Sequence, residues 1–168
     1  TATISPPSAT IPVGGSATFA AMVKDANGQI VDAAVEWSVD AGIGTIDADG
    51  TFTATAGTLT VRGNWTHTAG GTFNHNNGTV KFKPSYQVNI TIDVATNETF
   101  NNLYLGANYA SATISSGDTL IVLGTFTHHV YGYGSSINGG TVEARGNIVI
   151  EDTADASGGG TATISFLV

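Results

Sequence analysis

The chain has 168 residues, a formal net charge of −8, no cysteine and only 11% charged residues. A chain of this length holds one large β domain or two small ones. The small number of Lys and Arg residues argues against nucleic acid and membrane surfaces as partners, because both are bound mainly through clustered basic side chains. No disulfide can stabilise the chain, and its longest apolar run, around Leu120–Leu123, is too short for membrane insertion.

The composition predicts an all-β fold. Hydrophobic residues make up 41% of the chain and are spread along its length, which is not the composition of a disordered protein. Thr, Gly, Ser and Asn are abundant, and no long stretch has the 3.6-residue spacing of an amphipathic helix. Solubility must then come from short hydroxyl and amide side chains on the outer faces of strands. We expect a secreted, extracellular or cell-surface chain whose signal peptide was removed before residue 1.

Residues 1–57 alternate polar and apolar residues, with turn signals at short intervals. The opening predicts two strands joined by a Gly-Gly turn, the first confined to a sheet edge by its prolines. Asn27-Gly28 and Asp49-Gly50 each predict a hairpin turn. The sequence VEWSV predicts a central strand with Trp37 in the core. Short strands at this spacing are typical of a β-sandwich.

Three pieces of this segment resemble a known family. They are SATIPVGGSATFAAMVKDANGQIV, then VEWSV, then GTIDADGTFTATAGT. With them the segment resembles bacterial immunoglobulin-like domains, which occur in tandem on invasin-type and other prokaryotic surface proteins. The resemblance implies an N-terminal Ig-like β-sandwich at residues 1–57. Such domains close with one or two more strands after GTFTATAGT, so here the closing strand is either LTVRG or one from elsewhere.

From about residue 58 the sequence repeats itself. Residues 58–82 (TLTVRGNWTHTAGGTFNHNNGTVKF) match residues 119–144 (TLIVLGTFTHHVYGYGSSINGGTVEA), an internal repeat with an offset of about sixty residues. Between them, Asn-Asn-Leu at 101–103 is typical of a coil corner. Short strands between Gly and Asn corners predict a β-solenoid-like domain at residues 58–168, each turn burying its inner face against the next. The alternative is a second β-sandwich or jelly roll built of two similar halves.

This second part is similar to adhesin-like secreted bacterial proteins with parallel β-helix regions. The likeness is carried by the segments GNWT, GTFN, NGTV and TFNNL. It implies a structural or adhesive role on a prokaryotic cell surface.

Histidines and acidic turns are the candidate metal ligands. His67 and His128 take equivalent positions in the proposed repeat, and stacked imidazoles can hold Zn²⁺ or Cu²⁺. No carboxylate or thiolate stands at ligand spacing, so a solvent-facing polar ladder explains them more simply. The turns 25–28 and 47–50 do not fit a calcium-binding EF-hand loop, because the first has Ile30 where the loop needs Gly and the second has no Glu at the twelfth position. Asn-Gly and Asp-Gly turns need no ion. We therefore expect no metal and no cofactor.

The sequence does not predict an enzyme. Hydrolases and lyases that act on polysaccharides need clustered acids, whereas most acidic residues here are scattered and the run Glu151–Asp155 is most simply a solvated turn. No Gly-x-Ser-x-Gly elbow is present either.

Tyrosines and sequons are the candidate sites for carbohydrate. Tyr104, Tyr109, Tyr131 and Tyr133 form a possible strip for stacking sugars, and we select Tyr131 and Tyr133, in the flexible YGYG sequence, as glycan contacts. Four Asn-x-Ser/Thr sequons are candidate N-glycosylation sites. They are Asn64, Asn77, Asn89 and Asn97.

The two ends of the chain carry the same pentapeptide, TATIS. The closing Phe-Leu-Val has no polar cap, so a domain that ended there would leave backbone donors and apolar side chains without partners. If a strand of one copy were added to the sheet of the next, head to tail, it would pair these backbone groups and cover these side chains. Because the two contacting surfaces differ, such contacts do not form a closed ring, and a fibre results. The candidate assembly residues are Thr1, Ala2, Thr3, Ile4, Ser5, Thr161, Ala162, Thr163, Ile164, Ser165, Phe166, Leu167 and Val168.

The sequence thus predicts a non-enzymatic extracellular structural protein. We expect a subunit of a pilus-like surface filament, or a segment of a fibrous adhesin, whose partners are copies of itself or neighbouring repeats. The alternative is an adhesin module that binds a surface glycan or host ligand, and an enzyme acting on polysaccharide comes third.

Overall fold

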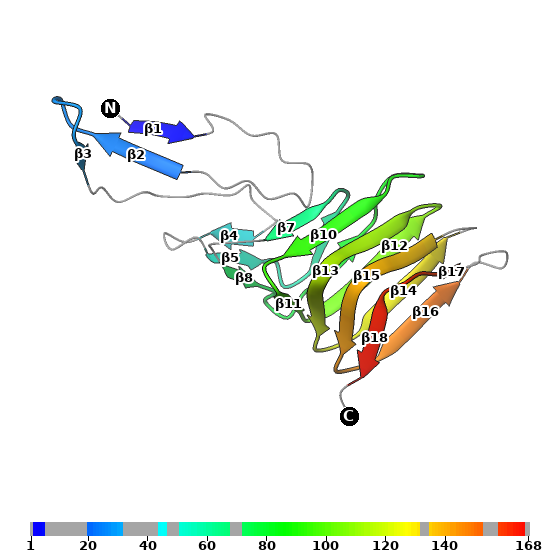
Figure 1. Cartoon of the computed structure of the whole chain (residues 1–168). Helices are drawn as coiled ribbons and strands as arrows, with labels where there is room; N and C mark the ends of the chain where they lie inside the picture. Colours follow the sequence, from blue (N-terminus) through cyan, green and yellow to red (C-terminus); the bar gives the residue numbers. More distant parts are fainter. Residues whose placement is uncertain are drawn as a thin grey trace.

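The computed structural model describes residues 2–5, 20–31, 44–46, 51–67, 72–131, 135–152 and 158–166, and the regular structure in these ranges is β-strand (Figure 1). The all-β prediction is confirmed for these residues. They contain no helix that could cross a membrane. The strands are β1 (Ala2–Ser5), β2 (Ala20–Lys24), β3 (Ile30–Val31), β4 (Gly44–Ile46), β5 (Thr51–Ala54), β6 (Thr58–Val61), β7 (Trp65–His67), β8 (Thr72–Asn74), β9 (Thr79–Phe82), β10 (Ile90–Val94), β11 (Asn97–Phe100), β12 (Asn102–Asn108), β13 (Ser111–Val122), β14 (Phe126–Tyr131), β15 (Ser135–Ala144), β16 (Ile148–Asp152), β17 (Gly158–Gly159) and β18 (Thr163–Phe166).

From β5 onward the chain winds in turns, and strands of adjacent turns pair in parallel. One sheet runs in the order β6–β9–β12–β14–β16, and another runs β7–β10–β13–β15–β17. Parallel strands that recur with one period are the mark of a β-solenoid. The period is about 22 residues, as the register partners of one column show: Leu59, Val80, Leu103, Phe126 and Ile148. The stack is therefore solenoid-like, as predicted, and not the alternative second sandwich.

Two long strands each contribute to two faces of the stack. β13 pairs with β10 up to Ile114 and with β11 from Thr119, and its register to β15 shifts between these residues. β15 bends at Gly139 and Gly140, whose positive φ angles of 64° and 32° suit glycine. The stack thus has three faces. We call β11, the C-terminal halves of β13 and β15, and β18 the first face, the β6-to-β16 sheet the second face, and β7, β10, the N-terminal halves of β13 and β15, and β17 the third face.

The alternation of apolar and polar residues decides which side chains fill the stack. In β6, Leu59 and Val61 are buried while the two threonines are not, and β9 repeats the pattern with Val80 and Phe82. Because successive side chains of a strand point to opposite sides, the apolar half of each strand points inward. The parallel register then places these side chains above one another, and they form one continuous hydrophobic core.

The predicted coil corner at Asn101-Asn102 is confirmed. The amide nitrogen Nδ2 of Asn101 donates to the carbonyl oxygen of Asn77 in the preceding turn, at 2.8 Å. The side-chain oxygen Oδ1 of Asn102 accepts from the backbone N–H of Thr125 in the following turn, also at 2.8 Å. In the next turns the corner is tight, since a Cβ at Gly146 would collide with the carbonyl oxygen of Gly124. Asparagine and glycine at these corners therefore connect and space the turns.

The repeat of about sixty residues is not the structural period, and that prediction was wrong. Thr58–Val61 lies on the second face, whereas its predicted counterpart Thr119–Val122 lies on the first face. His67 and His128 likewise lie on different faces, in β7 and β14. The two segments are similar because both are strand, corner and strand. That local pattern is the same for every face, so it does not indicate which face a strand belongs to.

Strands β1 to β4 are arranged differently from the stack. β1 pairs with β2 and β2 with β3, both antiparallel, so β1 is an edge strand of this small sheet, as its prolines predict. The hairpin at Asn27-Gly28 is confirmed; Oδ1 of Asp25 accepts from the N–H groups of Asn27 and Gln29 at 2.8 and 2.9 Å. β4 and β5 form the second predicted hairpin. Trp37 and the turn at Asp49-Gly50 lie outside the described residues, and an Ig-like sandwich is not shown.

β5 connects this region to the stack. It pairs in parallel with β8, so the parallel pairing begins at Thr51, shortly before the expected domain boundary at residue 58. The boundary stays a prediction.

Candidate functional site: the terminal turn and its surroundings

The segments with the shared TATIS sequence are both edge strands within the described residues. Ala2–Ser5 forms β1, which pairs with β2 of its own chain. Thr163–Phe166 forms β18, which pairs in parallel with the C-terminal half of β15. Thr161 and Ala162 precede β18 and connect to β15 just before its bend. Thr161 N–H donates to the side-chain oxygen Oδ1 of Asn138 at 3.2 Å, and Ala162 N–H donates to the carbonyl oxygen of Ile137 at 3.1 Å. Thr1, Leu167 and Val168 lie outside the described residues.

β16 and β18 form the last turn that the structure describes, here called the terminal turn, at the end of the stack farthest from β7 in Figure 1. Within the described ranges β16 pairs only with β14, and β18 only with β15. Each of these strands therefore has one edge whose N–H and C=O groups meet no described strand. Such an edge is a template for pairing with another strand.

Inward-pointing side chains are buried along the stack and become exposed at the terminal turn. On the first face, Phe100 and Val122 are 0% exposed, whereas Phe166, in the same column two turns after Val122, is 67% exposed. On the second face, Leu105 is 1% exposed and Ile150, two turns later, is 61% exposed. These side chains have the inward orientation of core residues, but no described turn covers them.

At the opposite end of the stack, β6 and β7 likewise pair with one described strand each, but their large apolar side chains are covered. Leu59, Val61 and Trp65 are buried there. The ring of Trp65 packs edge-on against that of Phe73, with centroids 4.9 Å apart. The two ends of the stack therefore present different surfaces.

An inward-pointing histidine lies beneath the terminal turn. His128 stands in register between Leu105 and Ile150, so its ring occupies a core position. Its Nε2 atom is buried and has no hydrogen-bond partner in the described part of the chain. Burial, and secondly the neighbouring His129, lower the pKa of His128, because the site disfavours a charged imidazolium.

A ladder of side chains crosses the outer side of the second face. Nζ of Lys81 lies 4.0 Å from the centre of the Tyr104 ring, and that ring stacks on the imidazole of His129 with centroids 5.7 Å apart. Nδ1 of His129 is 2.9 Å from Oε2 of Glu151. The ladder connects four consecutive turns through β9, β12, β14 and β16. Glu151 and Asp152 thus belong to strand β16 and not to the solvated turn expected there, and the Glu151 side chain contacts His129.

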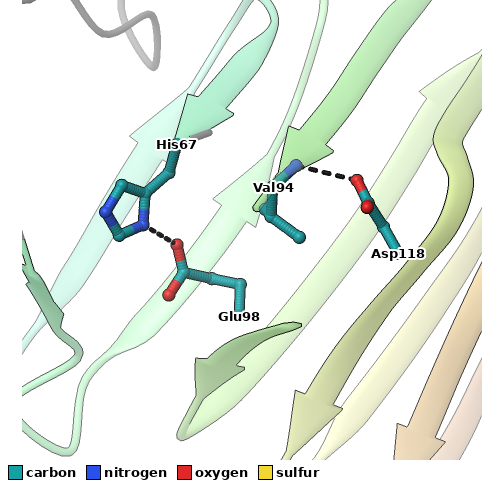
Figure 2. A network of polar contacts seen from close by, with 4 residues as sticks. All are labelled: His67, Val94, Glu98 and Asp118. Atoms are coloured by element: carbon teal, nitrogen blue, oxygen red, sulfur yellow. Dashed lines mark hydrogen bonds and ion pairs between the residues drawn. The ribbon is translucent and has the colours of Figure 1, made fainter. Parts of the chain in front are cut away.

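A second polar cluster lies where β7, β11 and β13 meet (Figure 2). Nδ1 of His67 is 2.6 Å from Oε2 of Glu98, whose side chain is almost fully buried. Burial raises the pKa of the Glu98 carboxyl, although the hydrogen bond and charge of His67 act in the opposite direction. Beside it, Oδ2 of the buried Asp118 accepts from the backbone N–H of Val94 at 2.8 Å.

This cluster has the chemistry of a structural contact. Asp118 satisfies a backbone donor at the bend of β13, and Glu98 is in contact with an imidazole that itself comes from a neighbouring strand. A hollow of about 320 Å³ lies elsewhere, lined by Gly44, Thr45, Thr53, Ala54, Thr55, Ala56 and Asn76, none of which titrates near neutral pH. The described residues contain no group of three or more His, Asp or Glu side chains arranged to hold a metal ion.

The predicted carbohydrate sites are described only in part. The backbone of Tyr131 pairs with Asn108 in β12, while the side chain of Tyr131 and all of Tyr133 lie outside the described residues. The four sequon asparagines are exposed. Two of them also serve the stack: Oδ1 of Asn64 accepts from Thr91 N–H at 2.8 Å, and Oδ1 of Asn89 from Ser111 N–H at 2.9 Å.

Sequence reasoning missed Ile150 and the contact between Glu98 and His67. A repeat of about 22 residues would have aligned Ile150 with His128 and Leu105 and shown it to be an inward position of the last turn. No sequence signal connects Glu98 with His67, because the pairing depends on how the turns stack.

Comparisons with protein-family models, with curated proteins and with solved structures give no match for this chain. The resemblances to bacterial Ig-like domains and to adhesins have no support from them.

Proposed function

We propose that the chain is a non-enzymatic structural module of an extracellular filament or fibrous adhesin, and that the terminal turn is its assembly surface. The observation that carries the proposal is the exposure of inward-pointing Ile150 and Phe166 next to two strand edges that meet no described strand. Covering apolar side chains contributes roughly 25 cal/mol per Å² removed from water. Strand addition supplies main-chain hydrogen bonds at the same place.

The partner in this proposal is a strand of a neighbouring copy, or the next repeat of a longer assembly. β1 is a suitable donor, since it is an edge strand and shares the sequence Ala-Thr-Ile-Ser with residues 162–165. In β1, Ile4 stands between Thr3 and Ser5, just as Ile164 stands between a threonine and a serine in β18. Because the two ends of the stack differ, contacts between copies run head to tail and extend into a fibre.

The secreted setting and the absence of catalysis remain part of the proposal. They are supported by the low content of charged residues and by the use of the buried carboxylates Glu98 and Asp118 in hydrogen bonds within the stack.

The second candidate function is an adhesin module that binds a glycan or host ligand. It is favoured by exposed tyrosines beside the stack, and Tyr131 and Tyr133 remain its predicted contacts.

Light scattering and electron microscopy of the purified chain over a range of concentrations test the assembly. The inward Ile150→Lys and Phe166→Lys changes place a charge where the next strand would pack. Val149→Lys is the matched control, because Val149 lies in the same strand, is exposed, and occupies an outward position in register with Thr127. Fibres that form with the wild type and the control but not with the inward variants support the proposal. A wild-type chain that stays monomeric at every concentration contradicts it.

A further inference from the structure

One corner of the stack is longer than the others. Between β7 and β10, the register partners Trp65 and Ile92 are separated by about five residues more than the usual period of about 22. The extra length lies in the segment 83–89, between β9 and β10, whereas β12 and β13 in the next turn are joined by only Tyr109 and Ala110. Insertions in a solenoid form loops on one face, and such loops often bind ligands.

This loop presents an aromatic pair to solvent. Tyr86, in the loop, and Tyr109, in the corner of the next turn, are 58% and 41% exposed. Their ring centres are 5.3 Å apart and their planes meet at 61°. Val88, also exposed, lies in the same loop. Exposed apolar surface that is contiguous often marks a binding or interaction site.

Tyr109, and Gln87 next to Tyr86, have an uncommon backbone conformation. Tyr109 has φ = 54° and Gln87 has φ = 59°, a region that bulky residues rarely adopt. Residues in this strained region cluster at binding and active sites. Within the loop, Val88 N–H donates to the Ser85 carbonyl at 3.2 Å. The loop is connected to the next turn of the stack by Oδ1 of Asn89, which accepts from Ser111 N–H at 2.9 Å.

Uncharged polar residues neighbour Tyr86 in the loop sequence, which begins with Lys83. Ser85, Gln87 and Asn89 alternate with Tyr86 and Val88 in the loop and supply hydroxyl and amide groups. Rigid tyrosines combined with serine, asparagine and glutamine give both apolar contact area and adaptable hydrogen bonds. A sugar ring offers the complementary surface, with apolar C–H faces and a rim of hydroxyl groups.

We propose that Tyr86 and Tyr109 form a binding site for a neutral polysaccharide. The rings contact the C–H faces of the sugar, and the loop amides and hydroxyls contact its rim. A second copy of the chain is a poorer occupant, because two rings and one valine are far below the roughly 800 Å² per partner of a stable protein interface. The site lies on the second and third turns, away from the terminal turn, and does not depend on the proposed assembly.

Tyr104 provides an internal comparison. It has the same side chain, but Lys81 and His129 already contact its ring within the ladder of the second face. We therefore expect Tyr104 to play no part in binding the polysaccharide.

Affinity electrophoresis in gels containing a neutral polysaccharide (β-glucan, xylan, mannan or amylose, one per gel) tests the site. The variants are Tyr86→Ala and Tyr109→Gly, the latter chosen because glycine accepts the positive φ without strain. We expect at least one polysaccharide to retard the wild type and each variant to bind it about tenfold more weakly, since the loss of one ring contact is worth about 1.4 kcal/mol. Tyr104→Phe is the control and should be retarded like the wild type.

Three results overturn the proposal. They are a wild type that none of the four polysaccharides retards, variants that are retarded as strongly as the wild type, and a change of oligomer size in the variants with no effect on retardation. Thermal unfolding of each variant establishes that a loss of retardation comes from the site and not from unfolding.

Discussion

Ala144 and Phe166 are register partners on the first face of the stack, yet Ala144 is buried and Phe166 is 67% exposed. Both point inward, so the difference arises because a further turn lies over Ala144 and no described turn lies over Phe166. In a solenoid each turn supplies the cover of the one before it. The terminal turn therefore has the side chains of a core without the burial of one.

Large-to-small substitutions along this column should separate the covered positions from the uncovered one. Phe100→Ala removes a fully buried ring and should lower the free energy of unfolding by about 3–5 kcal/mol. Phe166→Ala, in the same column, should change it by only about 0.5 kcal/mol in the monomer. Urea unfolding of dilute protein measures both. Equal losses for the two variants would mean that Phe166 is covered in solution.

The corner at Gly146 should tolerate no side chain. A Cβ there would collide with the backbone of Gly124 in the preceding turn, so Gly146→Ala should cost about 1–3 kcal/mol through forced separation of the turns. Gly159→Ala is the control, because a Cβ at Gly159 meets no atom within 4 Å. Chemical denaturation compares the two. A Gly146→Ala variant as stable as the control would contradict the close stacking of these corners.

His128 should make the stack less stable in acid. Because its pKa is lowered below the ordinary 6.5, the folded chain favours the neutral imidazole. The stability that this contributes is full above pH 6.5 and is lost as the pH falls through the lowered pKa. His128→Leu cannot ionise and fills the same core column, so its melting temperature should fall less than that of the wild type below pH 6.5. Thermal melts over this range test it, and parallel pH profiles for the two proteins would count against the prediction.

Glu98 should have the opposite effect. Its pKa is raised above the ordinary 4.5, so the folded chain favours the protonated carboxyl. The corresponding stability is full below pH 4.5 and is lost as the pH rises through the raised pKa. Glu98→Gln keeps a hydrogen-bonding group near His67 without a charge. The melting temperature of Glu98→Gln relative to the wild type should therefore increase as the pH rises from about 4 to about 8. A constant difference across this range would show that Glu98 does not titrate in the stack.

Local features of the fold were predictable from the sequence because they depend on neighbours in the chain. The alternation in β6 indicates which residues point inward, Asn27-Gly28 indicates a hairpin, and Asn101-Asn102 indicates a corner. The period was mistaken because it depends on how long each corner is and on the bends of β13 and β15 at Ile114 and Gly140.

The site was less predictable than the fold. His67 and Glu98 are 31 residues apart, and only the stacking of turns brings their side chains within 2.6 Å. Tyr86 and Tyr109 likewise meet across two turns, so the predicted tyrosine strip contained one ring of the pair and not the other. The assembly role of the C-terminal residues stays a prediction; the structure shows that Ile164 and Phe166 are exposed although their register partners Val142 and Ala144 are buried.

Hydrogen exchange of the backbone amides, measured at low and at high protein concentration, tests the assembly surface most directly. If the edges of β16 and β18 pair with strands of neighbouring copies, exchange in these two strands should slow as the concentration rises. Exchange in β14, which is already paired on both sides, should stay the same. Exchange in β16 and β18 that is equally fast at both concentrations would contradict the proposal that the terminal turn joins one copy to the next.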